Sequence, residues 1–152
     1  MATAYTTYTD GTSPKAGSGG NYAGSPERTV LTGVFDATRR NLAVNLDTIP
    51  IVTIPAGFWV EAVVIEILTP DAASQTISVG DVTDPNGWVV AAATDAAAGT
   101  KVLGAGAYAI ATGTSQTNGK LYTTATDLIL ENDTGKTATI GKFKVSVIGT
   151  IV

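Results

Sequence analysis

Short apolar runs separated by turn-forming residues repeat along the chain from Val30 to its end. The segments between them, TPDAAS, DVTDPNG, TGTSQTNG and NDTG, are rich in residues that favour turns. Runs of this length and spacing predict an all-β protein, an antiparallel β-sandwich or barrel. The expected strands are residues 28–35, 42–46, 50–54, 58–68, 75–80, 87–92, 106–111, 119–124, 127–132 and 137–152.

The last segment has the clearest strand pattern. From Gly141 onward, apolar and polar residues alternate with a period of two, which predicts one buried face and one wet face. The preceding NDTGK, residues 132–136, predicts a tight hairpin from the strand at 127–132. The alanine-rich segment 91–99 has no large core residue, so we expect a loop there with at most one helical turn.

The run GFWVEAVVIEIL, residues 57–68, is the most apolar in the chain. It is too short to span a bilayer, which takes about 20 residues, and its many β-branched residues favour strand over helix. In a uniform strand both of its faces are apolar and each carries one glutamate. Since no helices remain to cover the outer face, we expect another subunit to cover it. The expected subunit interface is Trp59, Glu61, Val63, Ile65 and Ile67.

The two glutamates of this run, Glu61 and Glu66, need partners if they are buried, because an unpaired buried charge is costly. Lys142 and Lys144 are suitable partners if the last strand lies alongside. An acid–base pair is the alternative role. In a uniform strand, however, the two side chains point to opposite faces, so structural carboxylates are the better interpretation.

Residues 1–27 contain no Val, Ile, Leu, Phe or Trp, so they cannot bury enough apolar area to fold alone. We expect an extended or disordered arm, residues 1–27, in front of a β-sandwich domain, residues 28–152. The start has neither the basic nor the apolar region of a signal peptide. Tyr5, Tyr8 and Tyr22 are expected to be contact points on a partner. The simpler alternative is a floppy terminus.

Composition narrows the possible functions. The net charge is −4, and no basic surface predicts binding to nucleic acid. The chain has no cysteine and no histidine, which excludes Ser-His-Asp and Cys-His catalysis and ordinary zinc sites. We expect no cofactor, no metal, no membrane span and no enzymatic activity. Charged residues make up only 14% of the chain, against roughly 25% in an average protein, which suits a surface partly buried in an assembly.

Several motifs have a simpler structural interpretation. GAGAYA at 104–109 fits a dinucleotide pattern, but no helix can follow it. GKT at 135–137 lacks the first glycine of a phosphate-binding loop. Asp81, Asp84 and Asn86 offer oxygen ligands that suit calcium, yet their spacing is not that of an EF-hand and such residues also make ordinary turns.

Aromatic residues give a second functional class. Trp59 and Trp88, with Tyr108 and Tyr122, are the residue types that stack on sugars. Trp59 is expected in the core and Trp88 at the surface after a turn. The alternative function is therefore a carbohydrate-binding β-sandwich module of a tail fibre or secreted enzyme. A hydrolase that uses Asp and Glu alone is a third class, without support from spacing.

Arg28, Arg39 and Arg40 lie where the arm joins the domain, and no other arginine occurs in the chain. A solvated patch is the simplest interpretation. Arginine also pairs well with carboxylates, so these three residues are candidates for contact with a partner surface.

The order of these segments resembles a known family. A polar arm leads to IPAGFWVEAVVIEILTP, then TISVGD, LYTTATDLILEND and GKFKVSVIGTIV, so the resemblance covers roughly residues 49–152. It is to the capsid decoration or cement proteins of tailed-bacteriophage heads. The resemblance implies a jelly-roll-like sandwich, usually a homotrimer, at three-fold positions of the major capsid protein lattice on the outer surface of the virion. It also implies extended termini that clasp neighbouring capsid subunits. It transfers no catalytic residue.

Overall fold

The computed structural model describes residues 28–40, 42, 46–109, 119–135 and 137–152. This part of the chain forms nine strands, and all of their pairings are antiparallel. The chain is therefore all-β, as predicted, and the described residues contain no helix that could cross a membrane. The strands are β1 (Arg28–Asp36), β2 (Thr48–Ile54), β3 (Phe58–Thr69), β4 (Thr76–Gly80), β5 (Val89–Ala93), β6 (Lys101–Leu103), β7 (Lys120–Tyr122), β8 (Thr126–Asn132) and β9 (Lys142–Ile151).

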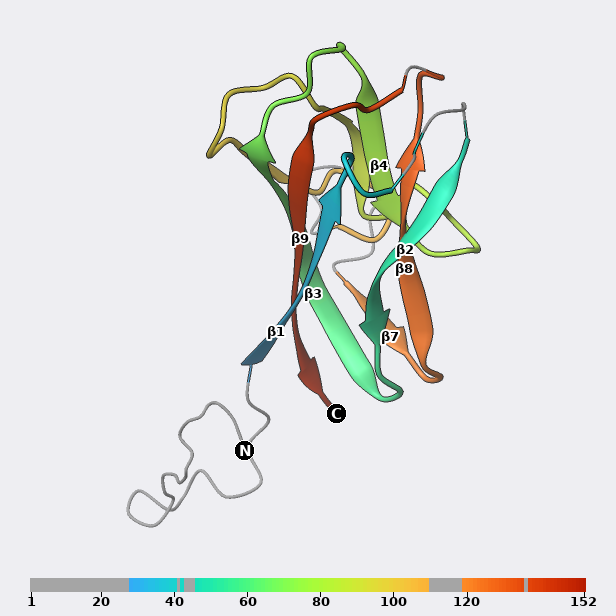
Figure 1. The fold of residues 1–152 in the computed structure, drawn as a ribbon. Helices are drawn as coiled ribbons and strands as arrows, with labels where there is room; N and C mark the ends of the chain where they lie inside the picture. The colour runs from blue at the N-terminus through green and yellow to red at the C-terminus, as the bar shows by residue number, and fades with distance from the viewer. Residues whose placement is uncertain (1–27, 41, 43–45, 110–118, 136) are drawn as a thin grey trace, which may run out of the picture.

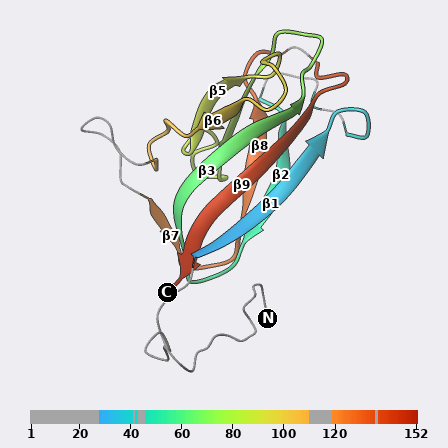
Figure 2. The same ribbon diagram turned by 90° about the vertical axis from the view of Figure 1, so that its left-hand side faces the viewer.

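Two sheets pack face to face. Sheet A has the order β1-β9-β3-β6, with β7 also paired to β3, and sheet B has the order β2-β8-β4-β5. Figure 2 shows β3, β9 and β1 side by side in front, with β2 and β8 behind them. The pairs β1–β9, β2–β8, β3–β6 and β4–β5 are nested from the chain ends inward, which is the topology of a jelly roll. Figure 1 shows the same two layers from the side.

The core lies between the two inner faces. Phe35 of β1 and Phe143 of β9 stack with their ring centroids 5.8 Å apart. Leu128 and Leu130 of β8 face them from sheet B, and all four side chains are fully buried. The alternation predicted for the last strand is confirmed, since Phe143, Val145 and Val147 face this core.

A β-bulge in β3 decides which way its side chains point. The register with β9 shifts between Val60 and Ala62, so β3 has one extra residue at that point. The residues that point inward are even-numbered before the bulge and odd-numbered after it. After the bulge, Val63, Ile65 and Ile67 face the core, and none is more than 1% exposed. The prediction that these three residues contact another subunit is wrong, because the bulge turns them into the core of their own chain.

Several expected elements differ in the structure. The hairpin expected at 132–136 is wrong, because β8 belongs to sheet B and β9 to sheet A. Residues 106–109 form turns in place of a strand, and strand β5 extends into the expected loop as far as Ala93. Leu42 is buried but lies in no strand. The rest of the two expected strands at 42–46 and 106–111 lies largely outside the described residues.

Candidate functional site: the outer face of sheet A

The side of sheet A that faces away from sheet B is the candidate site. It consists of the even-numbered residues of 28–36 in β1 and of 142–150 in β9, together with the outward residues of β3 and β6. We call it the outer face of sheet A. Because cross-strand neighbours on one face lie close together, the pairing register shows which outward residues of the four strands are neighbours.

The centre of the outer face is apolar. One row aligns Val30 of β1, Ile148 of β9 and Ala62 of β3. In the neighbouring row, Val64 of β3 lies opposite Leu103 of β6. Val30 is 57% exposed and Leu103 is 66% exposed, so two large side chains on opposite sides of the face meet solvent. Exposed apolar side chains flanking a partly apolar sheet face make this face a candidate contact site.

Ion pairs close one end of this face. Glu66 lies between Lys101 Nζ at 2.8 Å and Lys144 Nζ at 2.7 Å. Their hydrogen bonds, from Lys101 first and then from Lys144, lower the pKa of Glu66 to about 2. The predicted pairing of a glutamate of this strand with the last strand is confirmed for Lys144. Lys142 lies 3.3 Å from Asp36 of β1 instead.

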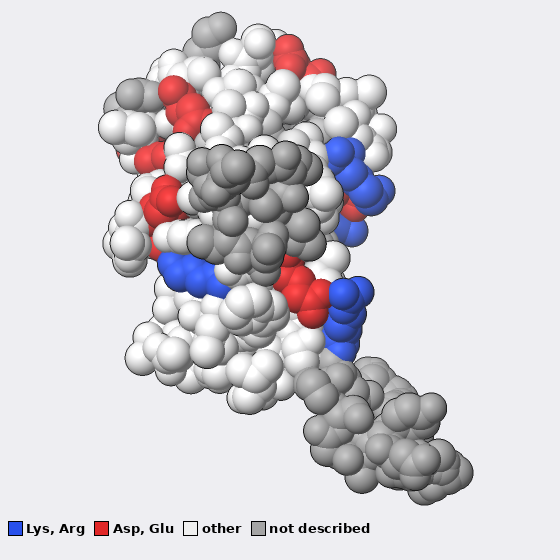
Figure 3. Space-filling model, turned by 180° about the vertical axis from the view of Figure 1, so that it is seen from behind, with Lys and Arg blue, Asp and Glu red and all other residues white. Residues whose placement is uncertain are grey.

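A second ion pair closes the other end. Arg28 Nη2 lies 2.5 Å from Glu61 Oε1, and the hydroxyl of Thr150 donates to Glu61 Oε2 at 3.4 Å. The bulge brings Glu61 onto the same face as Glu66, so the expectation that they point to opposite faces is wrong. Both carboxylates are paired with cations. Figure 3, which views the molecule from behind Figure 1 with the outer face of sheet A edge-on, shows acidic and basic side chains next to one another on a largely uncharged surface.

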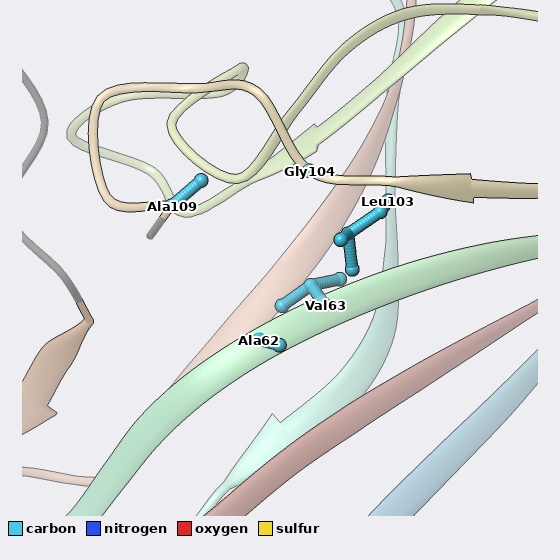
Figure 4. Close-up of a pocket in the computed structure, with 5 residues that line it drawn as sticks. All are labelled: Ala62, Val63, Leu103, Gly104 and Ala109. Atoms are coloured by element: carbon cyan, nitrogen blue, oxygen red, sulfur yellow. The ribbon is translucent and has the colours of Figure 1, made fainter. Parts of the chain in front are cut away.

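A small apolar pocket opens beside β3. Figure 4 shows its lining, which is Ala62, Val63, Leu103, Gly104 and Ala109. Its volume is about 40 Å³, far below the roughly 300–1,000 Å³ of sites for drug-sized ligands. The pocket has room for a single small side chain.

A buried polar network fixes the loop that follows β4. The Asp81 carboxylate accepts hydrogen bonds from Lys120 Nζ at 2.6 Å, the Tyr122 hydroxyl at 2.8 Å and the amides of Thr83 and Asp84 at 2.9 and 3.2 Å. Burial opposes the ionisation of Asp81, but these hydrogen bonds outweigh it and lower its pKa. Desolvation likewise opposes the charge on Lys120, but its bond to Asp81 prevails and raises the pKa of Lys120.

This loop contains the predicted calcium ligands Asp81, Asp84 and Asn86. A lysine ammonium group already holds the cationic position beside the Asp81 carboxylate. The part of the chain that the structure describes contains no group of three or more Asp, Glu, His or Cys placed to hold a metal ion. The geometry therefore lends calcium binding no support.

The aromatic residues do not form a sugar-binding platform. Trp88 is fully buried, and its Nε1 donates a hydrogen bond to the Tyr122 hydroxyl at 3.0 Å. Tyr108 packs edge-on against Trp88, with centroids 5.6 Å apart. Trp59 lies apart from them on the outer face of sheet A, half-buried, and not in the core as expected. The prediction that Trp88 is at the surface is wrong, and with it the carbohydrate alternative loses its main residue.

The candidate partner contacts fall into two groups. Tyr5, Tyr8 and Tyr22 lie outside the described residues. Arg39 and Arg40 are exposed in the turn after β1, and Arg39 Nε lies 4.0 Å from the carboxylate of Asp36. Nothing in the structure tests their contact with a partner, so it stays a prediction.

Sequence reasoning missed the contribution of β6. Lys101 and Leu103 belong to the outer face, yet residues 101–103 were expected in no strand. The signal is a single alternating triplet, KVL, between Gly99 and Gly104. Three residues are too few for a periodicity argument. Their place becomes evident only when Lys101 is found beside Glu66.

No protein-family model and no curated protein matches this chain. Two solved structures share its fold. One is a chain of the cyanophage Pam1 capsid asymmetric unit, with a TM-score of 0.62 and 17% sequence identity, covering 84% of this chain and 86% of that one. The other is a chain of the acid-stable capsid structure of Helicobacter pylori bacteriophage KHP30, with a TM-score of 0.55 and 15% identity, covering 81% and 86%. At these identities the likeness establishes the fold.

Proposed function

We propose that this chain is a structural virion protein that binds the outer surface of an assembled phage capsid as a decoration, or cement, homotrimer. Its partner in this proposal is the major capsid protein. The observation that carries the proposal is the outer face of sheet A, which has exposed apolar residues at its centre and neutralised charges at both ends. The two solved structures of the same fold come from phage capsids, which supports the virion role.

The composition of this face suits a protein interface. Protein–protein interfaces have an apolar centre and a polar rim from which charged residues are largely excluded at the core. Here Ile148, Ala62 and Val64 lie at the centre, Val30 and Leu103 lie exposed on either side of them, and the Arg28–Glu61 pair lies at the rim. We assign this face to contact between copies of the chain. The arm at residues 1–27 is then assigned to the capsid protein, as are Arg39 and Arg40, which lie at the other end of β1 from Arg28.

The proposed mechanism is mechanical. A protein that binds only the assembled shell, and not its separated subunits, stabilises the shell by mass action. Each decoration protein that bridges a joint adds buried area to that joint. The shell then withstands more heat or force before its subunits separate, without any chemical step.

Leu103→Asp tests the proposed surface, with Val90→Asp as the matched control. Leu103 lies on the outer face of sheet A and Val90, 45% exposed, lies on β5 of sheet B. We expect Leu103→Asp to abolish trimers in light scattering and to lower co-sedimentation with capsids of the source phage at least tenfold. Val90→Asp should behave like the parent chain. Equal binding by both variants, or a parent chain that is monomeric and does not sediment with capsids, contradicts the proposal.

A further inference from the structure

In the part of the chain that the structure describes, no strand pairs with the outer edge of β1, which leaves this edge unprotected. Proteins protect edge strands with proline, bulges or short length, because an open edge pairs with other chains. Edge strand β2 contains Pro50 and a bulge, and β5 contains Ala91 with φ 51° and a register shift. Strands β6 and β7 have three residues each. Strand β1, in contrast, runs for nine residues in unbroken register with β9 and contains no proline.

The register identifies which backbone groups lie on that edge. The amide of Ala37 donates to the carbonyl of Gly141 at 2.9 Å, directly beyond the pair Asp36–Lys142. Hydrogen-bonded and non-hydrogen-bonded pairs alternate along an antiparallel ladder. The odd-numbered residues of β1 therefore turn their N–H and C=O groups toward β9, and the even-numbered residues turn theirs toward the free edge. In Figure 2 no labelled strand lies beyond β1 on that side.

We propose that this edge binds the same edge of a second copy, as an antiparallel β1–β1 pair around a two-fold axis at Thr32. A two-fold contact requires a self-complementary edge. With Thr32 opposite Thr32 of the second copy, residues 28–36 pair with their full counterpart in reverse order. Every hydrogen-bonded pair then joins two even-numbered residues, which gives about ten inter-copy backbone hydrogen bonds, two for each of the five pairs. The two A sheets become one continuous sheet.

The outward side chains match in this register. Arg28 lies opposite Asp36 of the second copy, so the two ends of the contact carry opposite charges. Val30 lies opposite Val34 of the second copy, and these side chains are 57% and 55% exposed in the single chain. Cross-strand pairs of opposite charge stabilise antiparallel sheets, and pairing Val30 with Val34 removes exposed apolar surface from water.

The ion pairs within each copy extend this match. Arg28 already contacts Glu61, and Asp36 already lies 3.3 Å from Lys142. Across the proposed contact, four charged side chains form one row: Glu61 and Arg28 of one copy, followed by Asp36 and Lys142 of the second copy. The signs alternate along the whole row, so no like charges meet.

On the inward side, Leu31 lies opposite Gly33 of the second copy, so two large side chains do not meet there. Gly33 is required within its own chain, because an added Cβ would lie 1.9 Å from the carbonyl oxygen of Ile51. The backbone of Ile51 occupies that space, so the match between the two copies rests on the outward side chains.

Single-cysteine cross-linking tests this register, because the chain has no cysteine of its own. In the proposed pair the two Cα atoms of residue 32 lie about 5.5 Å apart, within the range of a disulfide. The matched control is Val30→Cys, whose two copies lie about 13 Å apart. We expect oxidised full-length Thr32→Cys to run at twice the 15.4 kDa chain mass on a non-reducing gel, and Val30→Cys to remain single. Absence of the Thr32→Cys product, or equal products from both variants, overturns the proposal.

Thr32→Pro gives a second test that does not depend on oxidation. The amide of Thr32 points to the free edge, so proline there leaves the β1–β9 ladder intact but removes the central inter-copy bonds. The two-fold contact joins two of the proposed homotrimers, so we expect light scattering to show one trimer, half the parent mass, for Thr32→Pro and the parent mass for Thr32→Val. An unchanged mass for folded Thr32→Pro contradicts the contact. The inference goes beyond the capsid role, and neither test uses a capsid or Leu103.

Discussion

The buried Asp81–Lys120 pair is the place where a single substitution is expected to reduce stability most clearly. The side chain of Asp81 is 3% exposed and that of Lys120 is 28% exposed. Asp81→Ala removes the acceptor for the Lys120 ammonium, for the Tyr122 hydroxyl and for two turn amides. Breaking one side of a buried ion pair costs about 3–5 kcal/mol. Because Lys120 keeps some contact with water, we expect about 3 kcal/mol.

Urea unfolding of a double-mutant cycle measures this effect. Lys120→Met keeps the aliphatic stem and removes the charge, so we expect it to cost less than Asp81→Ala, with a coupling energy of about 1–3 kcal/mol. Asp95→Ala, in an exposed turn, is the control and should change stability by no more than about 0.5 kcal/mol. A loss below about 1 kcal/mol for Asp81→Ala, or additive single effects, would refute the reasoning.

The pH dependence of the same variant gives an independent check. The folded-state pKa of Asp81 is lowered, so its contribution is present above its unfolded-state pKa of about 3.9 and is lost as the pH falls through the folded-state value. The stability difference between the parent and Asp81→Ala should therefore be full at pH 7. It should shrink below about pH 4. A difference that stays constant down to pH 2 contradicts an ionised, hydrogen-bonded Asp81.

Two further predictions concern backbone geometry. Gly33→Ala should lower the free energy of unfolding in urea by about 2 kcal/mol or more, because the new Cβ would lie 1.9 Å from the Ile51 carbonyl oxygen and the two sheets must separate locally. An unchanged free energy of unfolding contradicts this packing. Deletion of Ala62 should leave a folded chain that loses no more than about 2 kcal/mol, because removing the bulge keeps the residues of β3 on their present faces. Deletion of Ser146 from the regular strand β9 should prevent folding, because it turns the side chains of half of that strand to the opposite face. Near-ultraviolet circular dichroism compares the two deletion variants. If both fold equally well, the bulge does not have the role assigned to it.

The sequence predicted a strand well wherever the same set of alternate residues faces inward along the whole segment. Strand β9 is the best case, because Phe143, Val145 and Val147 all face the core. Strand β3 was misread because its alternation changes phase at the bulge. Treated as uniform, it has two apolar faces. Read with one extra residue after Val60, it has one apolar face and one face that carries both glutamates.

Topology could not be predicted from local signals. The turn at residues 132–135 was identified correctly, and the Asn132 side chain accepts hydrogen bonds from the amides of Thr134 and Gly135. The chain nevertheless crosses from sheet B to sheet A there, where a hairpin was expected. Turn residues determine the local backbone direction, whereas the pairing partner of the next strand depends on which apolar faces meet across the core.

The two outer faces of the sandwich differ in charge, and this difference bears on how copies associate. In the described residues, the strands of sheet B contain no lysine or arginine, while β8 carries Asp127 and Glu131, followed at once by Asp133. Burial, together with the charge of Asp133, raises the pKa of Glu131, and burial raises that of Asp133.

Two such faces repel one another at neutral pH, because like charges are brought together without partners. The outer face of sheet A has no such barrier, since Glu61 and Glu66 are neutralised by Arg28 and by Lys101 and Lys144. The charges therefore oppose association of like copies through sheet B and do not oppose the contacts proposed through sheet A and its β1 edge. This follows from where the charges lie, whichever partner covers the remaining surface.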